Sequence, residues 1–589
     1  MNLVALTCRA LAQAGPVTLT QRAIAAELGV SLGKANQLIR QAAVLGYLTT
    51  PQLELTQAGR DYLEPFKVAG AIVLAAGFGS RAVPLTFETP KGLLLVRGEP
   101  MTERLIRQLQ AAGVPRITLV VGYLKERFEY LTDKYGVELV FNPEFATKNN
   151  LTSLYCVRDR LAQSYVLVAD NWLETNPFNR YEPDSWMGGL YAAGPTSEWT
   201  TQLGPKGRIK GITIGGADTP VLLGPSFFSA DFAAEFVPLL ERAYATPGTE
   251  DWYFEHVLWH NLKRLPIYLR LLDQFNLHEF ENLAELRQFD TSYQADAHSA
   301  IMRQIAQVLD IPQSRISGIE PLKNGLMNAS FQFRTGRTEV DRFVFRRPQP
   351  GAAEWVDYAA ERSAYATLAP LGLTDELVWI DPADGHRITR FLTGARPLDP
   401  SNPDELRAAL ETIAQVHHSG LVFSAEPPLT ADLDRLRRLA QSRQAIQFAD
   451  YPEVDALVRR AAALPANAGA PTVPTHGDYT ASNVLVLPDG SIRLIDWELA
   501  GQRDPLTDVA SFVLAAGLDS DAAAAALTLY TGRLPARDEW VRFHTQAALV
   551  ALANTLWAEY RQALGEQLGE YPLLTYRRAK QHARAALGL

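Results

Sequence analysis

The chain has 589 residues, which exceeds what a single hydrophobic core supports, so several domains are expected. Its composition is ordinary for a globular protein, and its formal net charge of −9 argues against a chain built mainly to coat nucleic acid or an anionic membrane. The two cysteines match no metal-ligand spacing, and no apolar run is long enough to span a membrane. Because a signal-peptide pattern is also missing, we expect a cytoplasmic protein.

The first segment, residues 1–66, is predicted to be a small helical unit that ends in a hairpin. One helix is expected after Thr20 and a second from Ser31 to about Leu45, because both caps precede apolar residues at helical spacing. Residues 47–56 are predicted to form a two-stranded wing. This arrangement resembles the winged helix-turn-helix of MarR-like regulators, which implies DNA binding by the second helix.

The charge of this segment favours a different role. It contains five basic and four acidic residues, and so small a surplus neutralises phosphate poorly. A structural or docking module without DNA is therefore the preferred interpretation, and DNA stays open as an alternative partner.

The second segment, residues 67–293, alternates short apolar runs with amphipathic stretches. Four of these runs, rich in β-branched residues, are 69–74, 117–121, 137–140 and 165–168. Such strands alternating with helices predict a Rossmann-like α/β domain with a mixed, mostly parallel sheet covered on both faces.

The first apolar run enters a loop suited to phosphate. It contains Leu74-Ala75-Ala76-Gly77-Phe78-Gly79-Ser80-Arg81, and Pro90-Lys91 follows. Small side chains let backbone N–H groups approach phosphate oxygens, and the two cations can neutralise a triphosphate and its pyrophosphate leaving group. An ordinary strand-to-helix turn would not explain Arg81 and Lys91 at this spacing.

This segment resembles the nucleotidyltransferases that make NDP-sugars and CDP-alcohols, and within them the bacterial CTP:phosphocholine cytidylyltransferases. The resemblance continues through 142–145, 149–155, 168–171, 197–199, 250–253 and 278–281. It implies catalytic roles for Arg81 and Lys91. It also implies nucleotide contacts by Leu74, Ala75, Ala76, Gly77, Gly79, Asn149 and Asn150.

The same resemblance implies Mg²⁺ together with CTP. Asp170 follows a strand and is expected to hold the metal. The family's second metal-binding acid is usually an aspartate in a Glu-x-Asp arrangement, whereas this chain has Glu279-Phe280-Glu281. The resemblance therefore implies that Glu281 takes this role with a longer side chain.

A quaternary ammonium cannot donate hydrogen bonds and is best held by aromatic faces with acids nearby. Core packing is the competing interpretation of each aromatic residue. The candidate substrate contacts are Trp199, Glu198, Asp251, Trp252, Tyr253 and Glu279.

The third segment, residues 300–589, follows a polar stretch that we expect to be a linker. It is rich in strands at first and helical later, which predicts an α+β domain of two lobes. Its strongest signal is His476-Gly477-Asp478, with Asn483 and then Asp496 downstream. In kinase-like folds the first aspartate orients and deprotonates the attacking hydroxyl, while the asparagine and the second aspartate hold Mg²⁺ on the nucleotide.

This pattern resembles choline kinases and aminoglycoside phosphotransferases. The resemblance implies that ATP is bound by Asn324 and Ser330 in a phosphate-covering loop and by Arg346, with Glu361 as the ion-pair partner of Arg346. Asp504 and Asp508 are candidate supports of the catalytic loop, or helix N-terminal charges. Trp497 and Trp557 are candidate walls of a choline pocket, against core packing as the alternative.

Two active sites on one chain suggest consecutive reactions. We expect ATP-dependent phosphorylation of choline, followed by CTP-dependent conversion of phosphocholine to CDP-choline and pyrophosphate. The resemblance implies use in phosphocholine decoration of a bacterial surface polymer. The alternatives are the same steps on ethanolamine, another amino-alcohol, an amino acid derivative or a sugar, and a DNA-binding regulator that responds to choline or CDP-choline. The oligomeric state is not predicted.

Overall fold

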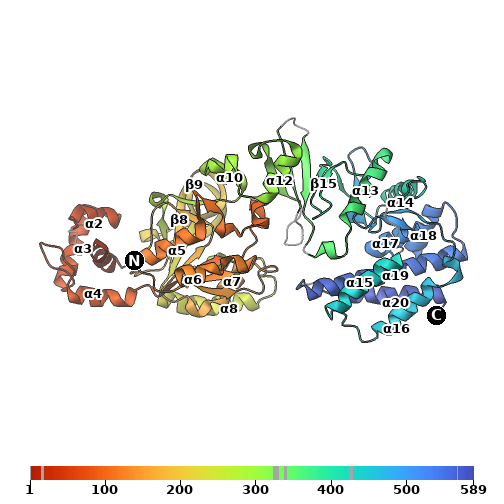
Figure 1. Ribbon diagram of the computed structural model, residues 1–589. Coiled ribbons are helices and arrows are strands. Elements are labelled where there is room, and N and C mark those ends of the chain that lie inside the picture. Colours follow the sequence, from red (N-terminus) through yellow and green to blue (C-terminus); the bar gives the residue numbers. More distant parts are fainter. Residues whose placement is uncertain are drawn as a thin grey trace. The chain divides into compact units, whose positions relative to one another are not determined.

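The computed structural model describes residues 2–14, 19–322, 330–336, 341–349, 351–423, 429–566 and 568–588 (Figure 1). The chain divides into two units, Met1–Leu326 and Met327–Leu589. Among the described residues no helix is long and apolar enough to cross a membrane.

The N-terminal part is helical, with α1 (Leu3–Ala14), α2 (Gln21–Glu27), α3 (Leu32–Val44) and α4 (Gln57–Leu63). The side chains of Thr20 and Ser31 accept hydrogen bonds from the first turns of α2 and α3, as expected of helix caps. Where a wing was predicted, a single antiparallel bridge joins Leu48 to Leu55. The winged-helix assignment stays a prediction.

Helix α1 fixes this part to the rest of the first unit. Arg9 forms an ion pair of 2.9 Å with Glu182, and both side chains are buried. The side chain of Tyr181 packs into the same apolar cluster as Cys8 and Leu11 of α1. The N-terminal helices are therefore part of a continuous unit with the α/β domain.

A seven-stranded sheet forms the centre of the first unit, in the order β10-β8-β9-β6-β1-β4-β5. Pairs β1–β4, β1–β6, β4–β5 and β10–β8 are parallel, whereas β6–β9 and β8–β9 are antiparallel. The strands are β1 (Gly70–Ala75), β4 (Ile117–Val121), β5 (Glu138–Phe141), β6 (Ser164–Val168), β8 (Trp186–Leu203), β9 (Ile209–Phe228) and β10 (Tyr268–Leu271).

Helices cover both faces of this sheet, because its central strands are apolar on both sides. Val73 of β1 belongs to a core cluster with α5 (Met101–Ala111) and α6 (Tyr130–Tyr135). The next residue, Leu74, belongs to a second cluster on the other face. The helices of that face are α7 (Asn150–Cys156), α8 (Ala230–Ala245) and α9 (Phe254–Asn261).

The second unit begins with strands and continues with helices. Antiparallel strands run in the order β13-β14-β16-β15, and a short hairpin, β19 (Val484–Val486) with β20 (Ile492–Leu494), carries the predicted catalytic loop. The other strands are β13 (Ser330–Arg334), β14 (Arg342–Arg346), β15 (Leu377–Ile380) and β16 (Arg387–Arg390). The helices include α13 (Tyr358–Leu368), α14 (Pro403–His417), α15 (Leu429–Ser442), α16 (Tyr451–Ala462), α17 (Leu506–Ala516), α18 (Ser520–Thr531), α19 (Arg537–Ala563) and α20 (Tyr571–Leu587).

Candidate active sites

A cavity of about 530 Å³ lies where β1 and β6 end. Ligand sites of open α/β sheets are found at this edge, where the carboxyl ends of parallel strands meet. All the residues from Leu74 to Arg81 line the cavity, as do Lys91, Asn149, Asn150 and Asp170. The structure thus brings together the nucleotide and metal residues predicted for the second segment.

Two ion pairs join cations of the loop to acids from distant parts of the chain. Lys91 pairs with Asp170, and Arg81 pairs with Glu281. Strand β11 (Leu277–Glu279) pairs antiparallel with β7 (Asn171–Leu173), and this pairing places Glu279 opposite the residue after Asp170. Strand pairing therefore carries the Glu279–Glu281 acids to Asp170, the aspartate that was predicted to bind metal.

The charges of this cavity are strongly coupled. Burial alone would lower the pKa of Lys91, but the charge of Asp170 raises it above its usual value. Burial raises the pKa of Glu279 to about 7, and repulsion from Asp170 adds to this rise. A raised pKa means that the neighbours of Glu279 stabilise its ionised form poorly. A cationic ligand in the cavity would stabilise that form.

The second candidate site lies beside the β19–β20 hairpin. The Asn483 amide donates hydrogen bonds to the Asp478 backbone oxygen at 2.9 Å and to its carboxylate at 3.0 Å. Burial raises the pKa of Asp478, and the nearby charge of Asp496 raises it further. Asp496 itself adopts a left-handed backbone conformation with φ of 72°, which is uncommon outside glycine and is found at functional sites.

The expected ion pair between Arg346 and Glu361 is wrong. Arg346 pairs with Asp496 and, at 2.9 Å, with Glu498. Glu361 pairs instead with Arg387, which also reaches Asp496 at 3.1 Å. Arg387 lies directly opposite Arg346 in the pairing of β16 with β14, and both guanidinium groups reach Asp496. Cross-strand register decides this pairing, and the sequence carried no signal for it.

A buried aspartate holds the backbone of the catalytic loop. The Asp508 carboxylate accepts hydrogen bonds from the backbone N–H of His476 at 2.7 Å and of Gly477 at 2.9 Å. His417 lies 3.0 Å from the same carboxylate. Asp508 is therefore a support of the loop, whereas Asp504 pairs with Arg542.

Comparisons with known proteins match families to both transferase segments of the chain. Residues 71–170 match the family model of the MobA-like NTP transferase domain, and residues 318–543 match that of the phosphotransferase enzyme family. The chain is 37% identical over 220 residues to the choline-phosphate cytidylyltransferase of Streptococcus pneumoniae, covering 37% of this chain and 96% of that protein. The chain belongs to the nucleotidyltransferase family of the choline-phosphate cytidylyltransferases.

A second curated protein and a solved structure are also similar to parts of the chain. The 2-aminoethylphosphonate cytidylyltransferase of Lancefieldella rimae is 37% identical over 227 residues, covering 38% of this chain and 92% of that protein. The crystal structure of choline kinase LicA from Streptococcus pneumoniae superposes with a TM-score of 0.43 at 21% identity, covering 49% of this chain and 99% of that one. The chain is therefore an enzyme that combines a cytidylyltransferase-family domain with a phosphotransferase domain.

The acids of the cytidylyltransferase-family domain fit a magnesium site that the nucleotide completes. Among the described residues no group of three His, Cys, Asp or Glu side chains could hold a metal ion by itself. Mg²⁺ is commonly bound by one or two carboxylates together with substrate phosphates, and Asp170 with Glu281 supplies such a pair next to the phosphate loop. In the other domain, Asn483 and Asp496 offer an amide oxygen and one carboxylate, which are also oxygen ligands that Mg²⁺ accepts.

The predicted substrate contacts of this domain fall into two groups. Asp251, Tyr253 and Glu279 line the cavity. Trp199 packs edge-on against Tyr253 at 6.2 Å, and Trp252 stacks on His260 of α9 at 4.8 Å. Neither tryptophan nor Glu198 is among the residues that line the cavity, although the charge of Glu198 is close enough to raise the pKa of Glu279.

In the phosphotransferase domain, one predicted substrate contact is wrong. Trp497 is 0% exposed and packs against His476 at 4.5 Å inside an apolar cluster, so it belongs to the core. Trp557 lies edge-on to Tyr571 at 6.4 Å, and the charge of Asp478 raises the pKa of Tyr571 beyond the effect of burial. Tyr571 therefore lies near Asp478, the predicted catalytic base, and nothing in its local sequence indicated this.

The remaining predicted ATP contacts can be placed only in part. Ser330 starts β13 and lies opposite Arg346 in the pairing of β13 with β14. Asn324 lies outside the described residues.

Proposed function

We propose that this enzyme phosphorylates choline with ATP and then transfers CMP from CTP to the phosphocholine, releasing pyrophosphate. The observation that carries the proposal is the presence on one chain of two charged nucleotide sites, one in each transferase domain. The product of the first reaction is the substrate of the second. CDP-choline would then serve as the donor for phosphocholine decoration of a surface polymer.

In the cytidylyl transfer, the phosphate of phosphocholine attacks the α-phosphorus of CTP and pyrophosphate leaves. Arg81 and Lys91 stabilise the charge that develops on the leaving phosphates, and the backbone N–H groups of the loop orient the triphosphate. Mg²⁺ held by Asp170 and Glu281 would supply further positive charge when bound.

The quaternary ammonium of phosphocholine requires a site that is negative and aromatic. Asp251, Tyr253 and Glu279 supply such groups in the lining of the cavity. A second buried carboxylate, Glu255, also has its pKa raised to about 7 by burial, with a contribution from Glu279. A cation without N–H donors would stabilise both ionised carboxylates, and this supports choline over a neutral sugar.

In the kinase reaction, Asp478 accepts the proton of the choline hydroxyl as its oxygen attacks the γ-phosphorus of ATP. The raised pKa of Asp478 makes it a stronger base than an exposed aspartate. Arg346 holds phosphate oxygens, and Asn483 and Asp496 are the groups that would hold Mg²⁺. The Trp557–Tyr571 pair offers aromatic surface near the attacking hydroxyl.

The alternatives make different chemical demands. A 2-aminoethylphosphonate substrate has a carbon–phosphorus bond that a kinase does not form, so the phosphotransferase domain favours a phosphate ester. Ethanolamine carries N–H donors, so carboxylates could bind it without aromatic side chains. A regulator that only binds choline would not need Asp170, Asp478, Asn483 and Asp496 together.

The test uses the full chain with ATP, CTP, Mg²⁺ and a panel of amino-alcohols, with the products measured by mass. We expect CDP-choline from choline, and Asp478→Asn should abolish this product while CDP-choline still forms from supplied phosphocholine. Asp170→Ala should do the reverse, with phosphocholine accumulating. Loss of both activities in either folded variant, or no turnover of any amino-alcohol, contradicts the proposal.

A further inference from the structure

The segment that follows the metal-binding acids lies along the nucleotide loop of the first site. We call residues 282–300 the clasp, and it contains α10 (Leu283–Phe289) and α11 (Ser292–Ala295). The Asp290 carboxylate accepts a hydrogen bond from the backbone N–H of Arg97 at 2.6 Å, and the Tyr293 hydroxyl donates to the backbone oxygen of Leu95 at 2.6 Å. These two hydrogen bonds therefore attach the clasp to residues 95–97, which follow Lys91 in the chain.

At its far end the clasp is held by Glu88. The Glu88 carboxylate accepts hydrogen bonds from the Ser299 hydroxyl and from the backbone N–H of Ala300 at 3.1 Å. Ser299 is 1% exposed and itself accepts from the N–H of Met302 at 3.2 Å. Glu88 and Ser299 together cap the first turn of α12 (Ala300–Leu309), where a negative charge is also favourable to the helix dipole.

Glu88 belongs to the loop that carries both phosphate-binding cations. Inside this loop, the Thr86 hydroxyl donates to the backbone oxygen of Gly79 at 3.1 Å. A Cβ atom at Gly79 would lie 3.0 Å from the Thr86 methyl group and 3.1 Å from the Lys91 Cβ. Because the two ends of the loop pack against each other, a contact that holds Glu88 also holds Arg81 and Lys91.

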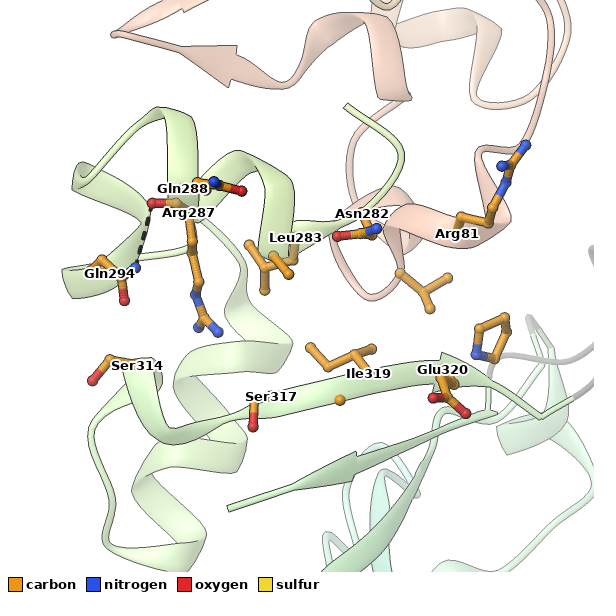
Figure 2. Close-up of a pocket in the computed structure, with 14 residues that line it drawn as sticks. Arg81, Asn282, Leu283, Arg287, Gln288, Gln294, Ser314, Ser317, Ile319 and Glu320 are labelled. Atoms are coloured by element: carbon orange, nitrogen blue, oxygen red, sulfur yellow. Dashed lines mark hydrogen bonds between the residues drawn. The ribbon is translucent and has the colours of Figure 1, made fainter. Parts of the chain in front are cut away.

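A cavity of about 650 Å³ borders this loop (Figure 2). Figure 2 shows Arg81 on one side, the clasp residues Asn282 to Gln288 on a second and strand β12 (Ser317–Pro321) on a third. The Arg81 side chain is 66% exposed, so little packing fixes it here. The attachment at Glu88 is one of the contacts that hold this loop, beside the ion pairs of Arg81 and Lys91.

We propose that Glu88 is a positioning residue for the nucleotidyl transfer. Its contact with the start of α12 holds residues 79–91 where Arg81 and Lys91 meet the triphosphate. The inference rests on the proposed CTP site. Nucleotide binding and docking of α12 favour each other, since both order the same loop.

The experiment compares full-length Glu88→Ala with wild type in the CTP reaction. We expect the KM for CTP to rise about tenfold, because the variant loses one charge-assisted contact. The KM for phosphocholine and the unfolding midpoint should stay unchanged. The matched control is Glu126→Ala, an exposed glutamate that pairs only with its neighbour Lys125 among the described residues, and it should change neither KM.

A second variant tests the contact itself. Ser299→Asp keeps a good cap for α12 but places a carboxylate against Glu88, so it should raise the KM for CTP as Glu88→Ala does. Adding Glu88→Gln to this variant supplies an amide donor and should restore most of the CTP affinity.

Nucleotide affinity is also measured directly by calorimetry with CTP and with UTP, without a second substrate. If wild type binds a nucleotide but does not convert phosphocholine, the proposed function fails while the calorimetry still compares Glu88→Ala with Glu126→Ala. A nucleotide affinity of Glu88→Ala within about twofold of wild type overturns the inference. So does an equal rise in both KM values together with a lower unfolding midpoint, which would indicate a purely structural role.

Discussion

The aspartates proposed to hold metal are each paired with a cation of the same site. Asp170 pairs with Lys91, and Asp496 pairs with Arg346. Both cations are also the proposed phosphate contacts. The cations that would meet the phosphates are therefore already held inside each site by the aspartates. Little reorganisation is then needed when the nucleotide binds, which is favourable for transfer chemistry.

Arg387 offers a test of this network. Its guanidinium lies between Glu361 and Asp496, and the Glu361 side chain is almost fully buried. Arg387→Met should lower the free energy of unfolding by about 3–5 kcal/mol, because it leaves a buried carboxylate without its partner. Kinase activity should fall with it, as Asp496 loses one of its two cations. Denaturant unfolding of the full chain measures the first effect.

Two further variants separate lost pairing from lost packing. The double variant Arg387→Met, Glu361→Met removes both charges and should recover most of the stability. Arg396→Met breaks only the exposed pair with Glu405 and should change stability by less than about 0.5 kcal/mol. A single Arg387→Met variant as stable as Arg396→Met would contradict the assigned pairing.

At the scale of elements, α19 and α20 pack along each other and enclose two histidines. The Nδ1 atoms of His544 and His582 lie 2.9 Å apart. Burial, together with the neighbouring His544 and Arg578, lowers the pKa of His582 to about 4. The neutral form is therefore the one that fits between the helices.

This arrangement predicts a pH dependence of stability. In the unfolded chain His582 has its ordinary pKa near 6.5, so between pH 6.5 and 4 the unfolded state binds more protons than the folded state. The contribution of neutral His582 to the free energy of unfolding is complete above pH 6.5. It falls by about 1–3 kcal/mol as the pH is lowered toward 4. His582→Gln should flatten this part of the stability profile, measured by denaturant unfolding at several pH values. If the free energy of unfolding of the variant changes with pH as steeply as that of wild type, the acid sensitivity comes from other groups.

At the scale of the whole chain, the N-terminal helices are joined to the α/β domain through a buried carboxylate. Burial would raise the pKa of Glu182, but the charges of Arg9 and Arg270 hold it below its usual value. The Tyr165 hydroxyl donates to the same carboxylate at 3.1 Å. The charged contact of this attachment comes from α1, whereas Ile39 and Ala42 of α3, the helix predicted to read DNA, belong to the same apolar cluster as Tyr181.

Arg9→Met tests this attachment. We expect hydrogen exchange of the α1 amides to become faster by at least about tenfold, since the buried Glu182 loses its ion pair with α1 and docking weakens. Exchange in strands β1 and β6 should stay slow. Arg22→Met, an exposed arginine of α2, serves as the matched control and should leave α1 protected. Equal exchange in both variants would show that apolar packing alone holds the N-terminal helices.

Local patterns were sufficient wherever neighbouring residues carry the chemistry. The phosphate loop with Arg81 and Lys91, the two helix caps and the alternation of strands and helices in the α/β domain all depend on residues close in the chain. For this reason the fold of the two transferase domains and the cations of the first site could be predicted.

The partners of these residues could not be predicted in the same way. Arg387 pairs with Glu361, 26 positions away, and Glu88 caps α12 by a contact to Ala300, 212 positions away. Tyr571 lies near Asp478, and Trp497 is buried in a packed core. Such contacts depend on strand register and on how helices pack, and one sequence contains no local signal for either. Side-chain chemistry decides which groups can act, and packing in three dimensions decides which of them meet.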